Sequence, residues 1–443
     1  MKSPCLITAI SQPLPGFFAG KHLTELKAPP PAAASNGQAF RQISLDTTWS
    51  CAVYNHAASL PESWNLAAPQ DNIFLSKTYL HALECYAPAG MDFAYILFYH
   101  HGKAAGVAYA QLLTFNAAKH IQSLSQPNPG IAQWIKQRVA ASLNMPLLVC
   151  GNMLLTGAHA FHFDAAYADE ANGARLVEAA TELISKGEAI PSLGAKAILA
   201  KDFEAGHAPF TQTLQAKGFH EIHFQPNMRM KLRPEWATFD DYLNAMSSKY
   251  RIRARRAFKK SECIERREMS LETAQKLDAE MHRLYRSVAN HASFNMVQLH
   301  SQYFSGMKAA LGDCFKIWGY YHNEQLVGFN TAIYNGKELE AHFLGFEDAQ
   351  NYDFQVYLNM LYDIVREAFK AKISHIVFSR TATEIKSSIG AEACQTFCYL
   401  RHRNPIMNRI AQSLVAYLSP QEDWEPRHPF REEEVSTSEV LGV

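Results

Sequence analysis

The sequence predicts an α/β protein of two related domains, in which helical and strand patterns alternate. The first observation is a repeated pattern: a helix with an aromatic side chain, an apolar strand, a polar turn and a second strand entered through a glycine. The pattern occurs at residues 74–80 and 98–107, and again at residues 297–304 and 320–329. The second observation is length, because 443 residues are too many for one ordinary core and suit two domains with tails. A repeat of so long a period predicts a duplicated domain and not a solenoid.

Composition excludes several classes of protein. The chain is 48% hydrophobic and 19% charged, which is typical of a globular protein with a large interior, and its formal net charge is zero. No global field therefore attracts nucleic acid or a membrane, and we expect no DNA partner. The amino terminus lacks the basic and apolar segments of a signal peptide, and the eight cysteines are scattered. We expect a cytoplasmic protein whose membrane contact, if any, is peripheral and on the inner face.

The chain divides by composition. Proline and alanine dominate residues 29–34, and the segment after Pro420 is acidic and rich in serine and threonine, so neither can bury enough apolar surface to fold. The predicted order is a disordered arm (1–45), a first domain (46–235), a basic linker helix (236–268), a second domain (269–419) and an acidic disordered tail (420–443).

Two patterns in the first domain predict a helix and a strand. Residues 177–184 are amphipathic at helical spacing, and residues 197–200 are a continuous apolar run. The uncharged stretch at residues 145–163 contains Pro146 and Gly151, which a membrane-spanning helix would accommodate only at a cost. We therefore expect two buried strands joined by a turn in that stretch.

Residues 249–267, between the domains, carry the strongest local charge signal, with nine Lys and Arg residues against two Glu. At helical spacing one stripe is apolar or aromatic, and it consists of Tyr250, Ala254, Ala257 and Phe258. We interpret the segment as a basic amphipathic helix that cradles an anion, namely a pyrophosphate, a nucleotide, a transfer RNA backbone or an anionic lipid surface. The alternative is a solvated helix whose charges pair with acidic segments elsewhere.

A strand is predicted at residues 337–345, where ionisable and apolar side chains alternate. Glu340 and His342 are two residues apart and therefore point to the same face. Either side chain is a candidate to accept a proton from an amine nucleophile, directly or through water. In the alternative interpretation, both side chains lie on the solvent-exposed face of an edge strand.

A helix at residues 354–371 and an apolar strand at residues 375–378 are predicted next. The strand leads directly into residues 379–391, and open α/β sheets place ligands at such strand ends. Donors suited to a phosphate or a carboxylate are Arg380, Thr381, Lys386 and Ser387. In the alternative interpretation Arg380 only clamps Glu384 across one helical turn.

These residues carry a resemblance to a known family. The strand leading to Arg380-Thr381, followed by Glu384-Ile385-Lys386-Ser387-Ser388-Ile389-Gly390-Ala391, resembles the Fem-like, peptidoglycan-biosynthesis-like tandem branch of the GNAT acyltransferase superfamily. Residues 239–243, leading through residues 248–251 to Arg255-Arg256, and residues 344–346 are also similar to that branch. The resemblance spans residues 50 to 410 and is most specific after residue 225. It implies two tandem GNAT-like domains, each a mixed, twisted sheet flanked by helices and splayed at the middle, with a cleft near the domain junction. It also implies transfer of an acyl or aminoacyl group to an amine from an acyl-CoA or a charged transfer RNA.

One departure from the family concerns the donor. GNAT enzymes bind the CoA pyrophosphate with a Gln/Arg-x-x-Gly-x-Gly/Ala loop, whose backbone amides point at the phosphates. The second domain has residues 345–353 there, with no glycine after Gly345 and three acidic residues. The first domain has Glu170-Ala171-Asn172-Gly173-Ala174-Arg175 before a helix, in which Gly173 is the candidate remnant of such a loop.

We therefore predict a GNAT-type N-acyltransferase that moves an acyl group from a thioester to an amine, with a lipid or cell-envelope precursor as a compatible acceptor. Acyl-CoA is the expected co-substrate, and no permanently bound cofactor is expected. The predicted catalytic residues are Glu340, His342, Arg380 and Lys386. The predicted donor-binding residues are Lys249, Arg253, Arg255, Arg256, Gly173 and Ser387.

Two other functions stay open. One is an aminoacyl-tRNA-dependent ligase acting on a cell-wall precursor, and the other is a degenerate, non-catalytic binding or scaffold protein. No metal site is predicted. Cys394, Cys398 and His402 are spaced four apart, but their segment has the pattern of a strand and no fourth ligand is evident.

Overall fold

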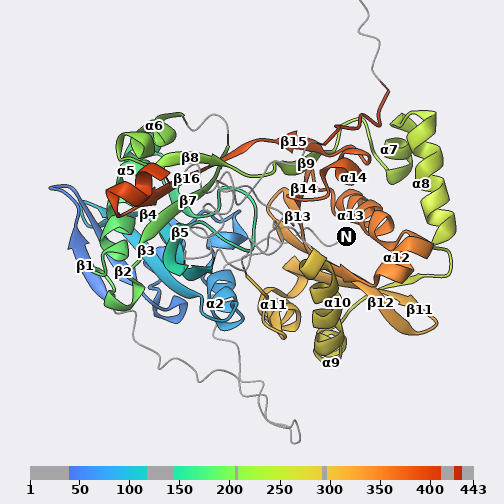
Figure 1. The fold of residues 1–443 in the computed structure, drawn as a ribbon, viewed down its shortest axis with the longest axis horizontal. Helices are drawn as coiled ribbons and strands as arrows, with labels where there is room; N and C mark the ends of the chain where they lie inside the picture. Colours follow the sequence, from blue (N-terminus) through green and yellow to red (C-terminus); the bar gives the residue numbers. More distant parts are fainter. Residues whose placement is uncertain (1–38, 117–143, 205–207, 292–296, 411–423, 432–443) are drawn as a thin grey trace, which may run out of the picture.

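The computed structural model describes residues 39–116, 144–204, 208–291, 297–410 and 424–431. These residues form two mixed sheets flanked by helices, so the predicted fold class is confirmed (Figure 1). The first sheet lies on the left of Figure 1 and the second on the right. Helices α2 (Lys77–Cys85) and α11 (Tyr303–Leu311) pack against each other between them.

The first sheet contains β1 (Arg41–Ser44), β2 (Trp49–Tyr54), β3 (Asp92–His100), β4 (Lys103–Asn116), β5 (Asn144–Cys150), β6 (Phe161–Phe163), β7 (Ala197–Glu204), β8 (His220–His223) and β16 (Thr396–His402). Its order is β1-β2-β3-β4-β5-β7-β16-β8, and β6 pairs with β4 beside β5. Only β5 and β7 are parallel. The two strands expected in residues 145–163 are therefore β5 and β6.

The second sheet contains β9 (Asn227–Lys231), β10 (Glu265–Glu268), β11 (Phe315–His322), β12 (Gln325–Asn335), β13 (Glu338–Phe346), β14 (His375–Ser379) and β15 (Glu392–Cys394). Its order is β10-β11-β12-β13-β14-β9-β15, and only β13 and β14 are parallel. In each sheet, antiparallel strands therefore lie on both sides of one central parallel pair.

The other helices are α1 (Ser63–Ala67), α5 (Glu170–Ser185), α6 (Ala208–Ala216), α7 (Phe239–Ala245), α8 (Ser248–Lys260), α9 (Leu271–Lys276), α10 (Asp278–His291), α12 (Asp348–Phe354), α13 (Val356–Ala371) and α14 (Thr383–Ser387). Helices α10 and α13 cover opposite faces of the second sheet. Leu284 of α10 shares a core with Phe329, whereas Val365 of α13 shares another core with Ala332. Among the described helices, none combines the length and the apolar character needed to cross a membrane.

Irregular backbone features repeat between the two sheets. The β3–β4 hairpin turns at His101-Gly102 and the β11–β12 hairpin at Asn323-Glu324, with positive φ at all four residues, as a two-residue turn of this kind requires. Each hairpin also shifts register close to its turn, after Phe98 and after Tyr320. Asp202 and Ser379, each two residues beyond the last parallel pair of its sheet, have φ of 66° and 59°. The predicted duplication therefore extends to the backbone conformation at the hairpin turns and beyond the parallel strand pairs.

The two domains exchange a strand. β16 comes from the carboxyl-terminal part of the chain but lies between β7 and β8 of the first sheet. β9 precedes the second domain's own strands but lies between β14 and β15 of the second sheet. The predicted boundaries at residues 235 and 269 miss this exchange, because a periodic pattern identifies a strand and not its neighbours. They also place β10 in the linker helix, although it pairs with β11.

Parts of the predicted arm and tail are ordered elements. Arg41–Ser44 forms β1 at the edge of the first sheet. Phe430 packs on Trp236 and Tyr242, with ring centroids 4.8 and 5.8 Å apart. These predictions were wrong locally because the average composition of a segment hides a single anchoring side chain. Residues 1–38 of the predicted arm and residues 420–423 and 432–443 of the predicted tail lie outside the described residues.

Candidate active site

The central parallel strands of the second sheet separate at their carboxyl ends. β13 and β14 pair only from Glu338–His375 to Glu340–Val377, and both strands continue beyond the last pair. A cavity of about 510 Å³ lies there, within the usual size of small-molecule sites. Tyr285 of α10 and Met360 of α13 both line it. Because these helices cover opposite faces of the sheet, the cavity crosses the sheet between the two strands.

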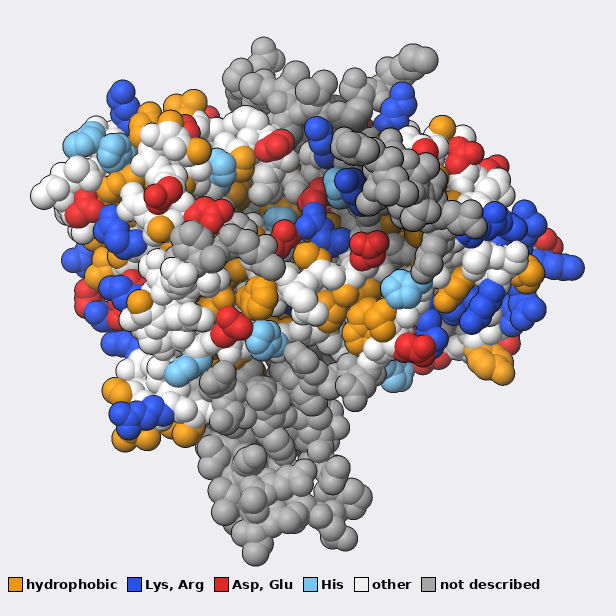
Figure 2. Space-filling view, turned by 90° about the horizontal axis from the view of Figure 1, so that it is seen from above, with side chains coloured by type: hydrophobic (Ala, Val, Ile, Leu, Met, Phe, Trp, Pro, Cys, Tyr) orange, Lys and Arg blue, Asp and Glu red, His pale blue; other side chains and the backbone are white. Residues whose placement is uncertain are grey.

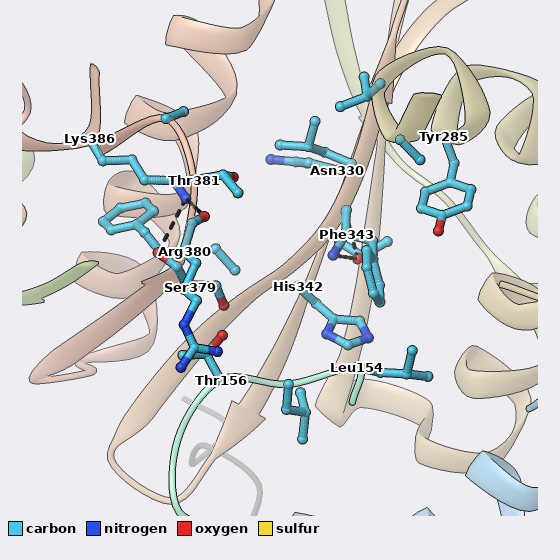
Figure 3. A pocket seen from close by; sticks show the side chains of 18 of the residues that line it. Leu154, Thr156, Tyr285, Asn330, His342, Phe343, Ser379, Arg380, Thr381 and Lys386 are labelled. Atoms are coloured by element: carbon cyan, nitrogen blue, oxygen red, sulfur yellow. Dashed lines mark hydrogen bonds between the residues drawn. The ribbon is translucent and has the colours of Figure 1, made fainter. Parts of the chain in front are cut away.

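The first domain closes one side of the cavity. Its contribution is the segment after β5, with Met153, Leu154, Leu155 and Thr156, together with Leu199 and Lys201 of β7 and Phe224. Figure 3 shows Leu154 and Thr156 below the cavity, with Lys386, Ser379 and Arg380 on one side and His342 and Phe343 on the other. Most of the lining is apolar. Ser379, Arg380, Thr381 and Lys386 line it at and after the end of β14, and Asn330 and His342 lie across the cavity from them (Figure 3). The site therefore lies at the junction of the domains.

Lys386 is buried at the cavity wall. Its Nζ donates to the carbonyl oxygens of Ser379, at 3.3 Å, and Arg380, at 2.6 Å (Figure 3). The turn that it braces contains three non-glycine residues with positive φ, namely Ser379, Thr381 and Ala382. Burial lowers the pKa of Lys386 to about 7, and attraction to Glu340 opposes this shift. Near neutral pH the amine therefore exists in both its charged and its neutral form.

Glu340 lies behind the cavity wall and is not among its lining residues. The carboxyl group accepts a hydrogen bond of 2.8 Å from Ser379 Oγ. Burial raises the pKa of Glu340 to about 8, although the Ser379 bond favours the charged form. Of the two predicted routes for Glu340, directly or through water, the structure does not offer the direct one, because Ser379 and Lys386 line the cavity in front of the carboxyl group.

His342 lines the cavity where β13 bulges. Opposite the bulge, Thr331 Oγ1 donates to the carbonyl of Phe343 and accepts its N–H, at 2.8 and 3.0 Å. His342 Nε2 lies 2.7 Å from the hydroxyl of Tyr303 on α11. Burial lowers the pKa of His342 to about 3, so the ring is neutral near pH 7. It suits hydrogen bonding to a substrate better than holding a full proton.

Arg380 ties the two domains together. Its Nε donates to the carbonyl of Gln225 and its Nη2 to Thr396 Oγ1, both at 2.9 Å. Both terminal nitrogens also bind Asp202, which is buried at the bulge of β7. Burial alone would raise the pKa of Asp202, but Lys201 and Arg380 hold it well below its usual range. The alternative interpretation, a clamp of Arg380 on Glu384, is wrong, since Glu384 pairs with Arg427.

The predicted donor-binding residues do not meet at this cavity. Lys249, Arg253, Arg255 and Arg256 are exposed on α8, whose Ala254 and Ala257 face the core. Gly173 lies inside α5, where an added Cβ would lie 3.0 Å from the Phe163 ring. This glycine therefore allows α5 to pack closely on Phe163 and is not part of a phosphate-binding loop. Ser387 is buried and bonded to the backbone of Glu384 and Arg427. Helical spacing predicted α8 but not its distance from the site, and Gly173 and Ser387 lie in helices rather than in the predicted loops.

Sequence analysis missed three polar residues around the site, namely Lys201, Asp202 and Tyr303. The first two follow the apolar strand at residues 197–200, which is the same signal that singled out Arg380 after β14. Tyr303 reaches His342 from a distant helix, and no local pattern predicts that contact. Among the described residues, no group of three or more His, Cys, Asp and Glu side chains could hold a metal ion.

A family model described as an acetyltransferase (GNAT) domain matches residues 248–387, from α8 to α14. The matched range includes both splayed strands, His342, Arg380 and Lys386. Residues 248–387 therefore form a GNAT acetyltransferase domain. Strands β10 to β14 of the second sheet lie in this range, and the first sheet repeats the same arrangement around β5 and β7.

The chain is also similar to solved structures at low sequence identity. A crystal structure of FemX is 14% identical, with 73% of this chain and 91% of that chain covered and a TM-score of 0.45. A tandem GNAT protein from the clavulanic acid biosynthesis pathway is 10% identical, with 74% and 89% covered and a TM-score of 0.43. L-PGS from Bacillus licheniformis is 9% identical, with 81% and 96% covered and a TM-score of 0.41. Similarities at this level carry no argument about substrate, and no curated protein matches the chain.

Proposed function

We propose that this GNAT protein transfers an acyl group from an acyl-CoA to an amine. The observation that carries the proposal is the cavity that crosses the sheet between β13 and β14, with Lys386 and His342 on its wall. An extended thioester threaded between the strands would bring its carbonyl carbon to these side chains. The apolar lining favours an acyl chain of several carbons over acetyl.

The proposed reaction uses Lys386 as the proton carrier. The amine nitrogen attacks the thioester carbonyl, a C–N bond forms, and the C–S bond breaks as the thiolate leaves. The attacking nitrogen loses one proton and the thiolate gains one. Lys386, whose pKa of about 7 makes both forms available, takes the first proton, stabilises the oxyanion as an ammonium and returns a proton to the thiolate. His342 hydrogen-bonds the amine, and Glu340 adjusts the charge of Lys386.

The residues between β13 and α13 favour one alternative donor. An ordinary GNAT pyrophosphate loop is rich in glycine, whereas here Glu347 and Asp348 lead into α12, and Glu347 binds Arg283 at 2.6 Å. Acidic side chains at that position oppose a pyrophosphate. This observation supports an aminoacyl-tRNA donor as the second candidate, in which the aminoacyl ester replaces the thioester.

The outer face of α8 supports a peripheral membrane contact, which would bring a lipid or cell-envelope acceptor within reach. Figure 2 shows Lys and Arg side chains gathered at the edge where α8 lies. No acidic partner of Lys249, Arg253, Arg255 or Arg256 is found among the described residues. Ile252 is 56% exposed between them. Cationic side chains around an apolar one suit an anionic bilayer.

Sedimentation with vesicles tests the membrane contact. Phosphatidylglycerol vesicles should retain the protein at low salt, and phosphatidylcholine vesicles should not. Charge reversal of Arg253, Arg255 and Arg256 should abolish the retention. Equal retention by both vesicle types would contradict the contact.

A melting series tests the donor. Free CoA, acetyl-CoA and longer acyl-CoAs should raise the melting temperature by amounts that grow with chain length, because a ligand that binds only the native state stabilises it. A flat response to the whole series would remove CoA as the donor. That result would favour the aminoacyl-tRNA-dependent ligase or the non-catalytic scaffold over the acyl-CoA-dependent enzyme.

A further inference from the structure

The charges around the cavity do not balance. Lys201, Arg380 and Lys386 line it, and no Asp or Glu is among the described residues that do. Behind the wall lie two buried carboxyl groups, those of Asp202 and Glu340. A buried charge without a partner is costly, so a lasting excess of one sign at a cavity indicates the charge of its ligand.

Lys201 is the cation in excess. Its Nζ donates to the carbonyl oxygen of Leu155 at 2.7 Å and pairs with Asp202, which Arg380 also binds. One carboxylate therefore faces two cations. The side chains of Lys201, Asp202 and Arg380 are 8%, 0% and 17% exposed, so water screens them little. Burial lowers the pKa of Lys201 although Asp202 opposes the shift, as expected for a cation short of negative charge.

The neighbouring groups do not remove this excess. A proton passing between Lys386 and Glu340 leaves their net charge at zero whether both are neutral or both are charged. Arg229 on β9 binds Glu204 and Glu338, but all three side chains are partly exposed to water. The thiol of Cys398, 3.4 Å from Asp202, stays protonated because burial raises its pKa to about 12.

We infer that the acceptor amine carries a carboxylate or a phosphate close to its nitrogen, and that this anion binds Lys201 while the acyl chain lies against the apolar walls. The inference rests on the proposed function and narrows the acceptor to amino acids and aminoalkyl phosphates. Neutral amines lack the negative charge that would balance Lys201. The product would be an amphiphile, anionic at one end and apolar along the rest.

Calorimetric titration of the full-length protein with product mimics tests the inference. The probes are N-decanoylglycine, N-decanoyl-O-phosphoethanolamine and the neutral N-decanoylethanolamine. At least one anionic mimic should bind about tenfold or more tightly than the neutral one, as a hydrogen bond to a charged group allows. The tighter of the two anionic mimics identifies the anion. Equal binding of all three, or binding of none, would overturn the inference.

Variants locate the anion. Lys201→Met should remove the preference for the anionic mimic, and Lys201→Arg should keep it. Lys196→Met, an exposed lysine just before β7, is the matched control and should behave as the unchanged protein. A preference that survives in Lys201→Met would also overturn the inference. The comparison of mimics in the unchanged protein needs no variant to fold, and a failure of the acyl-CoA melting series would separately contradict the proposed function.

Discussion

Arg380→Ala should weaken the junction of the two domains rather than only stop catalysis. The guanidinium joins Asp202 of the first sheet to the end of β14 in the second and also binds Gln225 and Thr396. Alanine would leave the fully buried carboxylate of Asp202 with Lys201 and the N–H of Gly157. Arg380, which the sequence predicts to be catalytic, is thus expected to have a mainly structural role.

The expected loss follows from the burial of the pair. Removing one partner of a buried ion pair costs about 3–5 kcal/mol, and Asp202 keeps a second cation, so we expect about 3 kcal/mol. The folded-state pKa of Asp202 is depressed, so its contribution is present above the unfolded pKa and is lost as pH falls through the folded value. The difference between the two proteins should therefore shrink below about pH 4, where the unfolded carboxylate protonates.

Urea denaturation at pH 7, followed by circular dichroism, measures the loss. Arg255→Ala on the exposed face of α8 is the control and should change the free energy of unfolding by less than about 0.5 kcal/mol. The double variant Asp202→Asn/Arg380→Ala should lose less than the two single variants added together. Unchanged stability of Arg380→Ala together with lost turnover would refute the structural role and restore the catalytic one.

Three further results are expected. Relative to Glu340→Gln, the wild type should lose stability from pH 5 to pH 8, because native Glu340, with its pKa raised to about 8, holds a proton that the unfolded chain has released; urea denaturation of both proteins over that range measures the difference, and a constant difference would contradict it. Lys386→Met should lower kcat by at least about 100-fold, whereas steady-state rates near wild type would exclude Lys386 as the proton carrier. Phe430→Ala should lower the free energy of unfolding by about 2 kcal/mol, because the partly buried ring loses its contacts with Trp236 and Tyr242, whereas Ile406→Ala, at an exposed site, should leave it unchanged.

The sequence was sufficient to predict the duplication, because a helix, a hairpin and a glycine-containing strand recur with local signals of their own. The hairpin turns at residues 101–102 and 323–324 and the parallel centre of each sheet follow this pattern. Strand exchange was not predictable in the same way. Which sheet receives β9 or β16 depends on long-range pairing, and the residues of a strand are equally suited to either neighbour.

The candidate site was predictable only in part. Lys386 was predicted because it follows the apolar strand at residues 375–378, and His342 because it alternates with apolar residues along a strand. The structure places both side chains on the cavity wall. The basic residues of α8 were misplaced, since charge density along the chain says nothing about distance from a cavity. The bond between Tyr303 and His342 and the pair of Asp202 with Arg380 join residues far apart in sequence, and only the fold brings them together.

Product analysis tests the central claim most directly. The protein is incubated with decanoyl-CoA and a mixture of amino acids, aminoalkyl phosphates and neutral amines, and mass spectrometry quantifies amides and free CoA. Thioester-dependent acyl transfer predicts one amide in amounts equal to the free CoA released, and neither product above background with Lys386→Met. Release of CoA without any amide, or no reaction with the thioester at all, would contradict it.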